Sequence, residues 1–236
     1  MSRCISRRIF LCLAGGALAA PTLSWAANDV PALLDHILLG CSDLDRGIAF
    51  VEERTGVRAA FGGVHPGRGT QNALLSLGTR RYLEIIAPDP KQSGAQQYAV
   101  ITKLTEPRLI GWAAHPGDLQ SFAAKLAKSG VAAAGPAPGS RSRPDGRVLQ
   151  WKTLTLKANA ADLLPFFIEW SADSIHPSAD APKGCSLLRF EAASPDPEAL
   201  SKQLALLGLD LPIVKGDSPQ LRATIFGPKA QFSVTS

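Results

Sequence analysis

The sequence predicts an α+β protein in which paired βαβββ modules form a cupped, mixed β-sheet with helices outside, plus a shorter third βαββ-like C-terminal module. The main observation is an internal repeat of three stretches. Each stretch begins with a strand, followed by a short turn that contains an acidic residue or proline. A helix comes next and ends at a glycine, and further strands follow. The helical stretches, 43–56, 118–130 and 196–208, have almost equal lengths. One module covers only one sheet face with its helix, so two modules side by side predict a concave cup suited to a ligand.

The first module follows this order closely. Residues 33–40 are an apolar run of strand length. Asp43 is a helix N-cap signal, and Gly56 is a typical residue for the end of the helix. Residues 73–77 and 81–86 are apolar runs separated around a Gly-Thr pair, which predicts a hairpin.

The second module repeats the same order. Residues 109–114 predict a strand, the helix follows at 118–130, and residues 148–156 and 165–170 predict two more strands. The stretch 135–147 is rich in Gly, Pro, Ser and Arg. We therefore expect a loop or a ragged hairpin there.

The third module is shorter. Residues 186–192 predict a strand, the helix lies at 196–208, and residues 220–226 and 230–234 predict a last hairpin. We expect this part to cap the sheet edge or to form a homodimer contact. The predicted organisation is a leader at 1–26, a two-module domain at 27–180, and a partial C-terminal module at 181–236 packed on that domain.

The composition excludes several classes of partner. The formal net charge is +5, but three of the 25 basic residues and none of the 20 acidic residues lie in the first 26 positions. The rest of the chain is close to charge balance, which does not favour a nucleic-acid or membrane-surface partner. The low aromatic content of 6% also argues against a base-stacking platform.

The N-terminal segment has the features of an export signal. Arg7 and Arg8 precede an apolar run at 9–20, and the pair resembles a twin-arginine signal. Small residues at Ser24 and Ala26 predict cleavage after Ala26 and a periplasmic location. An uncleaved membrane anchor is the alternative, but the apolar run is shorter than the about 20 residues that a spanning helix needs. No other stretch is long and apolar enough to span a membrane, so we expect no membrane span in the mature chain.

Two cysteines, Cys41 and Cys185, remain after that cleavage. An oxidising compartment permits a disulfide between them. Two separate buried thiols fit the sequence equally well, so both arrangements stay open.

Three polar residues stand out within apolar strands. His36 lies in the run 33–39, Glu84 in 82–86 and Glu169 in 165–170. An ionised glutamate is costly in such a strand unless something pairs with it. The two acids hold matching places in the repeat, so we expect both to face the middle of the cup with His36. The structural alternative for His36 is a histidine packed in the core. The structural alternatives for Glu84 are an edge position in the sheet or a salt bridge to an arginine.

Several motifs together point to one known family. They are LDH at 34–36, SDL at 42–44, GGVHPGRGTQN at 62–72, YLEI at 82–85, RPDG at 143–146 and PFFIEW at 165–170. In these motifs the chain resembles the vicinal-oxygen-chelate superfamily and, within it, the glyoxalase-like domain family.

The resemblance implies a metal site. In that superfamily the ligands come from the first and last strands of each module, so His36, Glu84 and Glu169 would be three of four ligands. Gly111 stands at the fourth position, which leaves a place for water or substrate, or else means that no metal binds. One histidine and two carboxylates suit Zn, Mn, Fe, Ni or Co.

The resemblance also implies a function. A metal-dependent lyase, isomerase or dioxygenase would act on a small oxygenated molecule, with Glu84 and Glu169 as catalytic carboxylates. A metal-free protein that sequesters a small molecule in the same cup is the alternative.

Further residues are candidates for substrate binding. The glycine-rich stretch 62–72 leaves polar groups free to meet a ligand, although it also fits a structural turn. The arginines at 141, 143 and 147 could bind an anionic group, while a solvated loop is the more usual interpretation. The candidate contacts to a small-molecule substrate are His65, Arg68, Thr70, Asn72, Trp112 and His176.

Overall fold

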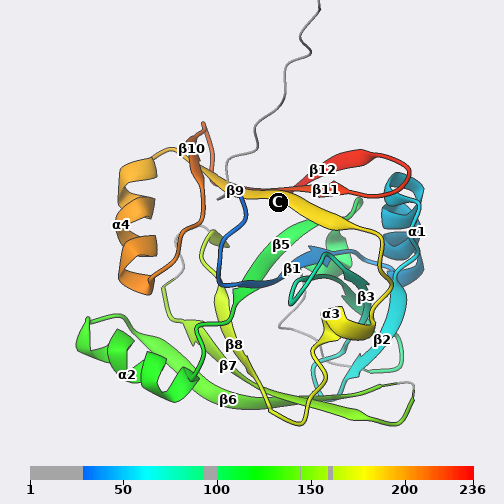
Figure 1. Cartoon of the computed structure of the whole chain (residues 1–236), viewed down its shortest axis with the longest axis horizontal. Helices are drawn as coiled ribbons and strands as arrows, with labels where there is room; N and C mark the ends of the chain where they lie inside the picture. The colour runs from blue at the N-terminus through cyan, green and yellow to red at the C-terminus, as the bar shows by residue number, and fades with distance from the viewer. Residues whose placement is uncertain (1–28, 93–99, 144, 159–161) are drawn as a thin grey trace, which may run out of the picture.

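The computed structural model describes residues 29–92, 100–143, 145–158 and 162–236. The predicted export signal lies outside the described residues. Within them, strands of the first two modules form a closed barrel with the order β1-β4-β3-β2-β6-β7-β8-β5 (Figure 1). The strands are β1 (Leu34–Gly40), β2 (Ala60–His65), β3 (Thr70–Ser76), β4 (Tyr82–Pro88), β5 (Arg108–Ala114), β6 (Ala133–Ser142), β7 (Val148–Leu156) and β8 (Phe166–Trp170).

The pairing of the strands confirms the duplicated, strongly curved mixed sheet. β1 runs parallel to β4, and β5 runs parallel to β8. The two modules meet through the antiparallel pair β1 and β5. On the opposite side a single pair, Val64 with Ser142, joins β2 to β6 in the described residues. The predicted cup is therefore closed into a barrel, whose interior can enclose a ligand.

The helices start and end where the repeat predicts. Asp43, Asp118 and Asp196 each accept a hydrogen bond from a backbone N–H of the helix that follows. Gly56 and Gly208 are left-handed at the helix ends, a conformation that glycine adopts without a Cβ penalty. The helices are α1 (Leu44–Thr55), α2 (Leu119–Lys128) and α4 (Pro197–Leu207), together with the short η2 (Ile101–Lys103) and α3 (Pro177–Asp180).

Of the two arrangements that the sequence left open for residues 135–147, the structure has the irregular hairpin. Most of the stretch belongs to β6, which pairs antiparallel with β7. Most of its residues are exposed, so it carries no hydrophobic period to reveal it. Its prolines are tolerated because the register shifts between Ala134 and Ala137 and because its other edge is largely unpaired.

The C-terminal part forms a second sheet with the order β10-β9-β11-β12 (Figure 1). This sheet packs against β5 of the barrel. Trp112 lies in the shared core, with its ring 5.5 Å from that of Phe190, and its Nε1 donates to the Leu163 carbonyl. The strands are β9 (Ser186–Ser194), β10 (Ile213–Lys215), β11 (Gln220–Phe226) and β12 (Gln231–Thr235).

The two cysteines are separate. Cys41 and Cys185 are both buried and both free. The Cys41 thiol lies 3.5 Å from the carbonyl oxygen of Ile86. Of the two arrangements that the sequence left open, the structure therefore has the unpaired thiols.

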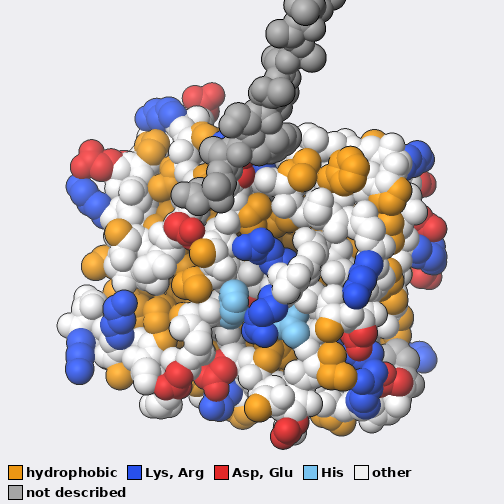
Figure 2. All heavy atoms as spheres, in the orientation of Figure 1, with side chains coloured by type: hydrophobic (Ala, Val, Ile, Leu, Met, Phe, Trp, Pro, Cys, Tyr) orange, Lys and Arg blue, Asp and Glu red, His pale blue; other side chains and the backbone are white. Residues whose placement is uncertain are grey.

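The surface is mixed in charge. On the face in Figure 2, basic and acidic side chains are interspersed with apolar ones. Among the described helices, none combines the length and the hydropathy that crossing a bilayer requires.

Candidate active site inside the barrel

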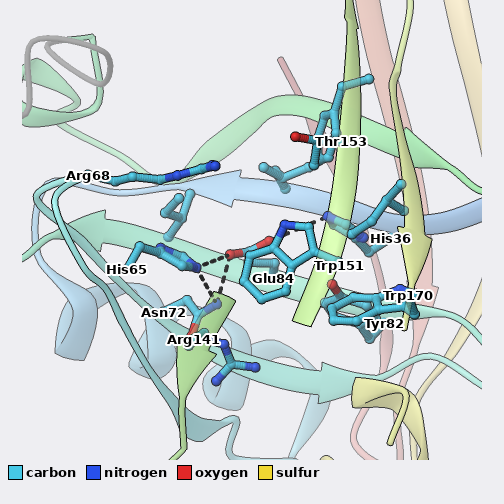
Figure 3. Close-up of a pocket in the computed structure, with 14 residues that line it drawn as sticks. His36, His65, Arg68, Asn72, Tyr82, Glu84, Arg141, Trp151, Thr153 and Trp170 are labelled. Atoms are coloured by element: carbon cyan, nitrogen blue, oxygen red, sulfur yellow. Dashed lines mark hydrogen bonds and ion pairs between the residues drawn. The ribbon is translucent and has the colours of Figure 1, made fainter. Parts of the chain in front are cut away.

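The barrel encloses a cavity of about 70 Å³ (Figure 3). Side chains from both modules line it, and the first module supplies most of the polar ones. Trp151, Phe166, Ile168 and Trp170 form an apolar wall from the second module. The polar lining is His36, His65, Arg68, Asn72, Tyr82, Glu84, Arg141 and Thr153.

Glu84 occupies the centre of the polar side. Its Oε1 accepts a hydrogen bond of 2.8 Å from the Asn72 amide. The Nε2 atom of His36 lies 3.5 Å from its Oε2, and the Nε2 atom of His65 lies 3.7 Å from its Oε1. The carboxylate therefore lies between two imidazoles (Figure 3). Burial alone would raise the pKa of Glu84, but His65, His36 and the Asn72 hydrogen bond outweigh it and hold that pKa below its usual value.

His36 is held from behind by a buried acid. Its Nδ1 lies 2.7 Å from Asp35 Oδ1, so its Nε2 is left for the cavity. The other Asp35 oxygen accepts from Trp170 Nε1 at 3.1 Å and lies 3.1 Å from His176 Nε2. Burial opposes ionisation of Asp35, but the hydrogen bonds of His176 and His36 hold its pKa well below the usual value. A carboxylate in this place fixes the tautomer and the ring orientation of the histidine.

His65 is held in a similar way by Thr70. Its Nδ1 lies 2.9 Å from the Thr70 hydroxyl, and its Nε2 faces Asn72 and Glu84. Burial lowers the pKa of His65, while the charge of Glu84 acts in the opposite direction without cancelling the shift. Thr70 is fully buried and supports His65, and it does not line the cavity.

Glu169 does not join His36 and Glu84. Its Oε2 accepts a hydrogen bond of 2.7 Å from the Leu119 backbone at the start of α2, and its Oε1 lies 3.3 Å from Lys152 Nζ. A carboxylate is stabilised at a helix N-terminus, which gives Glu169 a structural role on the outer face of β8. The expectation that Glu169 shares the site is therefore wrong.

The register of the two modules explains this error. Leu38 pairs with Glu84, and Ala113, which holds the same place in the second module, pairs with Phe166. Phe166 is thus the counterpart of Glu84. Glu169 lies three positions further along the strand, and an odd shift turns a side chain to the other face.

Two other predicted contacts lie elsewhere. Trp112 belongs to the core between the barrel and the second sheet, so its prediction as a substrate contact is wrong. His176 is buried behind Asp35, with Nδ1 2.9 Å from the Ser178 hydroxyl, and is not among the cavity-lining residues. Gly111 supplies no ligand, and a Cβ placed there would meet nothing within 4 Å.

The side chains at the centre fit a divalent metal in their chemistry. His36, His65 and Glu84 offer two imidazole nitrogens and a carboxylate, a donor set that transition metals accept. Each imidazole has its Nδ1 engaged, as is usual for metal-binding histidines. In the described parts of the chain, no three His, Cys, Asp or Glu side chains are spaced to hold an ion as they stand. The three side chains therefore fit a metal in their donor types and in their orientation. In this proposed ligand set, His65 takes the place that the sequence predicted for Glu169.

Comparison with known proteins gives the family. A family model described as a glyoxalase-like domain matches residues 34–208. No curated protein matches the sequence. Among solved structures, a hypothetical protein from Staphylococcus aureus is similar with a TM-score of 0.62 and 18% identity, over 85% of this chain and 84% of that chain.

Two further structures are similar over a smaller part of this chain. Methylmalonyl-CoA epimerase from Mycobacterium tuberculosis has a TM-score of 0.44 and 21% identity, over 62% of this chain and 92% of that chain. A hypothetical protein from Bacillus halodurans has a TM-score of 0.45 and 19% identity, over 60% of this chain and 96% of that chain. The Staphylococcus aureus structure, at 18% identity, shows the fold alone. The family model, in contrast, covers most of the chain, both barrel modules included, and the chain therefore belongs to the glyoxalase-like domain family.

Proposed function

We propose that this protein is a metal-dependent isomerase or lyase that moves a proton on a small oxygenated molecule bound inside the barrel. The observation that carries the proposal is the position of Glu84, a buried carboxylate between two imidazoles that are each anchored through Nδ1. The superfamily contains metal-dependent isomerases and epimerases, which supports this class of reaction.

His36, His65 and Glu84 would hold the ion, and Zn, Mn, Fe, Ni and Co all accept this donor set. A bound divalent metal supplies Lewis-acid polarisation of substrate oxygens. The contacts of Asp35 with His36 Nδ1 and of Thr70 with His65 Nδ1 leave each Nε2 directed inwards, where a neutral imidazole could bind the metal.

Glu84 is also the group that we assign to proton transfer, a role for which its carboxylate would have to leave the metal. Glu84 is ionised near neutral pH, since its pKa is lowered, so once released it could accept a proton from the substrate. The Asn72 amide holds one of its oxygens, which fixes the direction of the other. Trp151, Phe166 and Trp170 form an aromatic wall of the cavity, which lowers the polarity around the reacting atoms.

Metal analysis of protein purified without chelator tests the proposal. We expect about one equivalent of a transition metal in the wild type. His36→Ala, His65→Ala and Glu84→Gln should lose it. Glu169→Gln is the matched control, because it neutralises a half-buried glutamate of the same barrel outside the cavity, and it should keep the metal.

A different outcome would favour another function. Protein that stays metal-free when metals are supplied, and that still binds small molecules in the barrel, would be a sequestering protein of the same fold. Metal that is lost in Glu169→Gln but kept in His65→Ala would show that the ligand set is wrong.

A further inference from the structure

We propose that the substrate carries a carboxylate and that Arg141 binds it inside the barrel. This inference rests on the proposed function for the position of the reacting atoms. Arg141 lies on β6, is 3% exposed, and lines the cavity together with Glu84 (Figure 3).

The partners of the neighbouring arginines set Arg141 apart. Arg143 Nη1 lies 2.7 Å from Asp180, and Arg147 Nη2 lies 2.6 Å from Asp145. In the described part of the chain, the Arg141 guanidinium has no Asp or Glu oxygen within 4.0 Å, and its buried Nη1 has no hydrogen-bond partner. An unpaired buried cation is costly, so an anion that enters the cavity gains a partner that is already desolvated.

Two glycines of β2 make the space for this side chain. A Cβ on Gly62 would lie 2.8 Å from Arg141 Nη1, and a Cβ on Gly63 would lie 3.2 Å from Arg141 Cγ. The Cβ on Gly62 would lie closer still to Asn72 Oδ1, and the Cβ on Gly63 closer still to the Ser142 carbonyl oxygen, so larger residues would disturb the neighbouring strands as well as Arg141. The Gly-Gly pair therefore allows the close packing in which Arg141 lies beside the polar centre.

The charges of the cavity also favour an anion. Arg68 is half-buried, lines the same cavity, and has no carboxylate within 4.0 Å in the portion of the chain that the structure covers. Glu84 is the acid among the lining residues, and two arginines line the cavity with it. A lining with more positive than negative charge attracts and orients an anionic group.

The cavity is small, with a volume of about 70 Å³, so a small anionic group suits the place beside Glu84. A planar carboxylate also matches the fork of a guanidinium, which can donate two parallel hydrogen bonds. The cavity adjoins a groove of about 510 Å³ that shares His65, Arg68 and Trp151, so the rest of a longer substrate can lie there.

The test measures binding of malonate by calorimetry, with glycerol as an uncharged probe and inorganic phosphate as a second anion. We expect the wild type to bind malonate more tightly than phosphate, and to bind glycerol weakest. Arg141→Gln should weaken malonate binding about 10-fold or more, as expected for the loss of a charge-assisted hydrogen bond. Arg147→Gln, in the same hairpin but paired with Asp145, should bind malonate like the wild type.

The metal content of each variant separates this inference from the proposed function. Weaker malonate binding by Arg141→Gln at unchanged metal content supports the role of Arg141 whatever the reaction is. If Arg141→Gln fails to fold, Arg141→Lys decides, because lysine keeps the charge but loses the two parallel donors. We expect Arg141→Lys to bind malonate at least about 3-fold more weakly than the wild type. Unchanged malonate affinity in the folded variants, no malonate binding by the wild type, or tighter binding of phosphate would overturn the proposal.

Discussion

Asp35 and His36 are neighbours in one strand, yet their side chains meet, with 2.7 Å between Asp35 Oδ1 and His36 Nδ1. Successive side chains of a regular strand point to opposite faces. Here the register between β1 and β5 shifts between Leu34 and His36, and such an irregularity re-aims side chains. The consequence is an acid that lies directly behind the imidazole and sets which of its nitrogens faces the cavity.

Asp35→Asn should therefore weaken metal binding. An amide cannot replace the charge that orients the imidazole, and loss of such an outer partner costs about 10-fold to 100-fold in metal affinity. Competition with a chelator of known affinity measures the effect. Asp45→Asn, an exposed acid on α1, is the control and should leave the affinity unchanged. Equal affinities for both variants would show that Asp35 does not position His36.

The lowered pKa values of Asp35 and Glu84 predict a specific acid sensitivity. A carboxyl group whose folded pKa is lowered stabilises the fold above its unfolded pKa of about 4, and this contribution is lost as the pH falls towards the folded pKa. Metal-free protein should lose free energy of unfolding as the pH drops from about 5 to about 3. The Asp35→Asn variant should lose less free energy of unfolding than the wild type over the same pH range. Urea unfolding at each pH measures this difference. Parallel curves for the two proteins would contradict the assignment.

Glu169→Gln should affect stability rather than binding. Glu169 accepts a hydrogen bond from the first turn of α2 and pairs with Lys152, and charge at a helix N-terminus is worth about 0.3–1 kcal/mol. We expect a loss of that size in the free energy of unfolding, with an unchanged metal content. Lys152→Gln, which removes the partner cation, should cost no more than the glutamate change. A Glu169→Gln protein that is metal-free but fully stable would show that Glu169 is a ligand and has no structural role.

The leader yields a prediction that the sequence alone supports. We propose that the protein is exported through the twin-arginine route and cleaved after Ala26. Intact-mass measurement of the protein recovered from the periplasm should give a chain that begins at Ala27. Replacing Arg7 and Arg8 together by lysine should leave the protein inside the cell with its leader attached. A periplasmic protein that retains Met1 would contradict cleavage.

Much of the fold could be predicted because it follows from local signals. The capping acids Asp43, Asp118 and Asp196 indicated where the three helices begin, and apolar runs indicated most strands. The sequence did not predict β2, and it left β6 open as a loop or a ragged hairpin. Glycines and prolines occupy these strands and exposed positions dominate β6, so neither strand has a clear hydrophobic period.

The site was predictable only in part, because it depends on register between distant strands. His36 and Glu84 were recognised as polar residues in apolar strands and they do meet. Glu169 gave the same signal, but a helix start outside the barrel satisfies it, which no pattern within the strand reveals. His65 was expected to touch substrate, and its position beside Glu84 follows from the β2–β3–β4 pairing. The sequence also grouped Arg141 with two neighbouring arginines, although it differs from them in burial and in partners.

The most direct test of the site is an anomalous difference map from crystals of the protein grown with its metal. We predict one strong peak within bonding distance of His36 Nε2, His65 Nε2 and the Glu84 carboxylate. A peak beside Glu169, or an ordered metal bound away from these three side chains, would contradict the proposed ligand set.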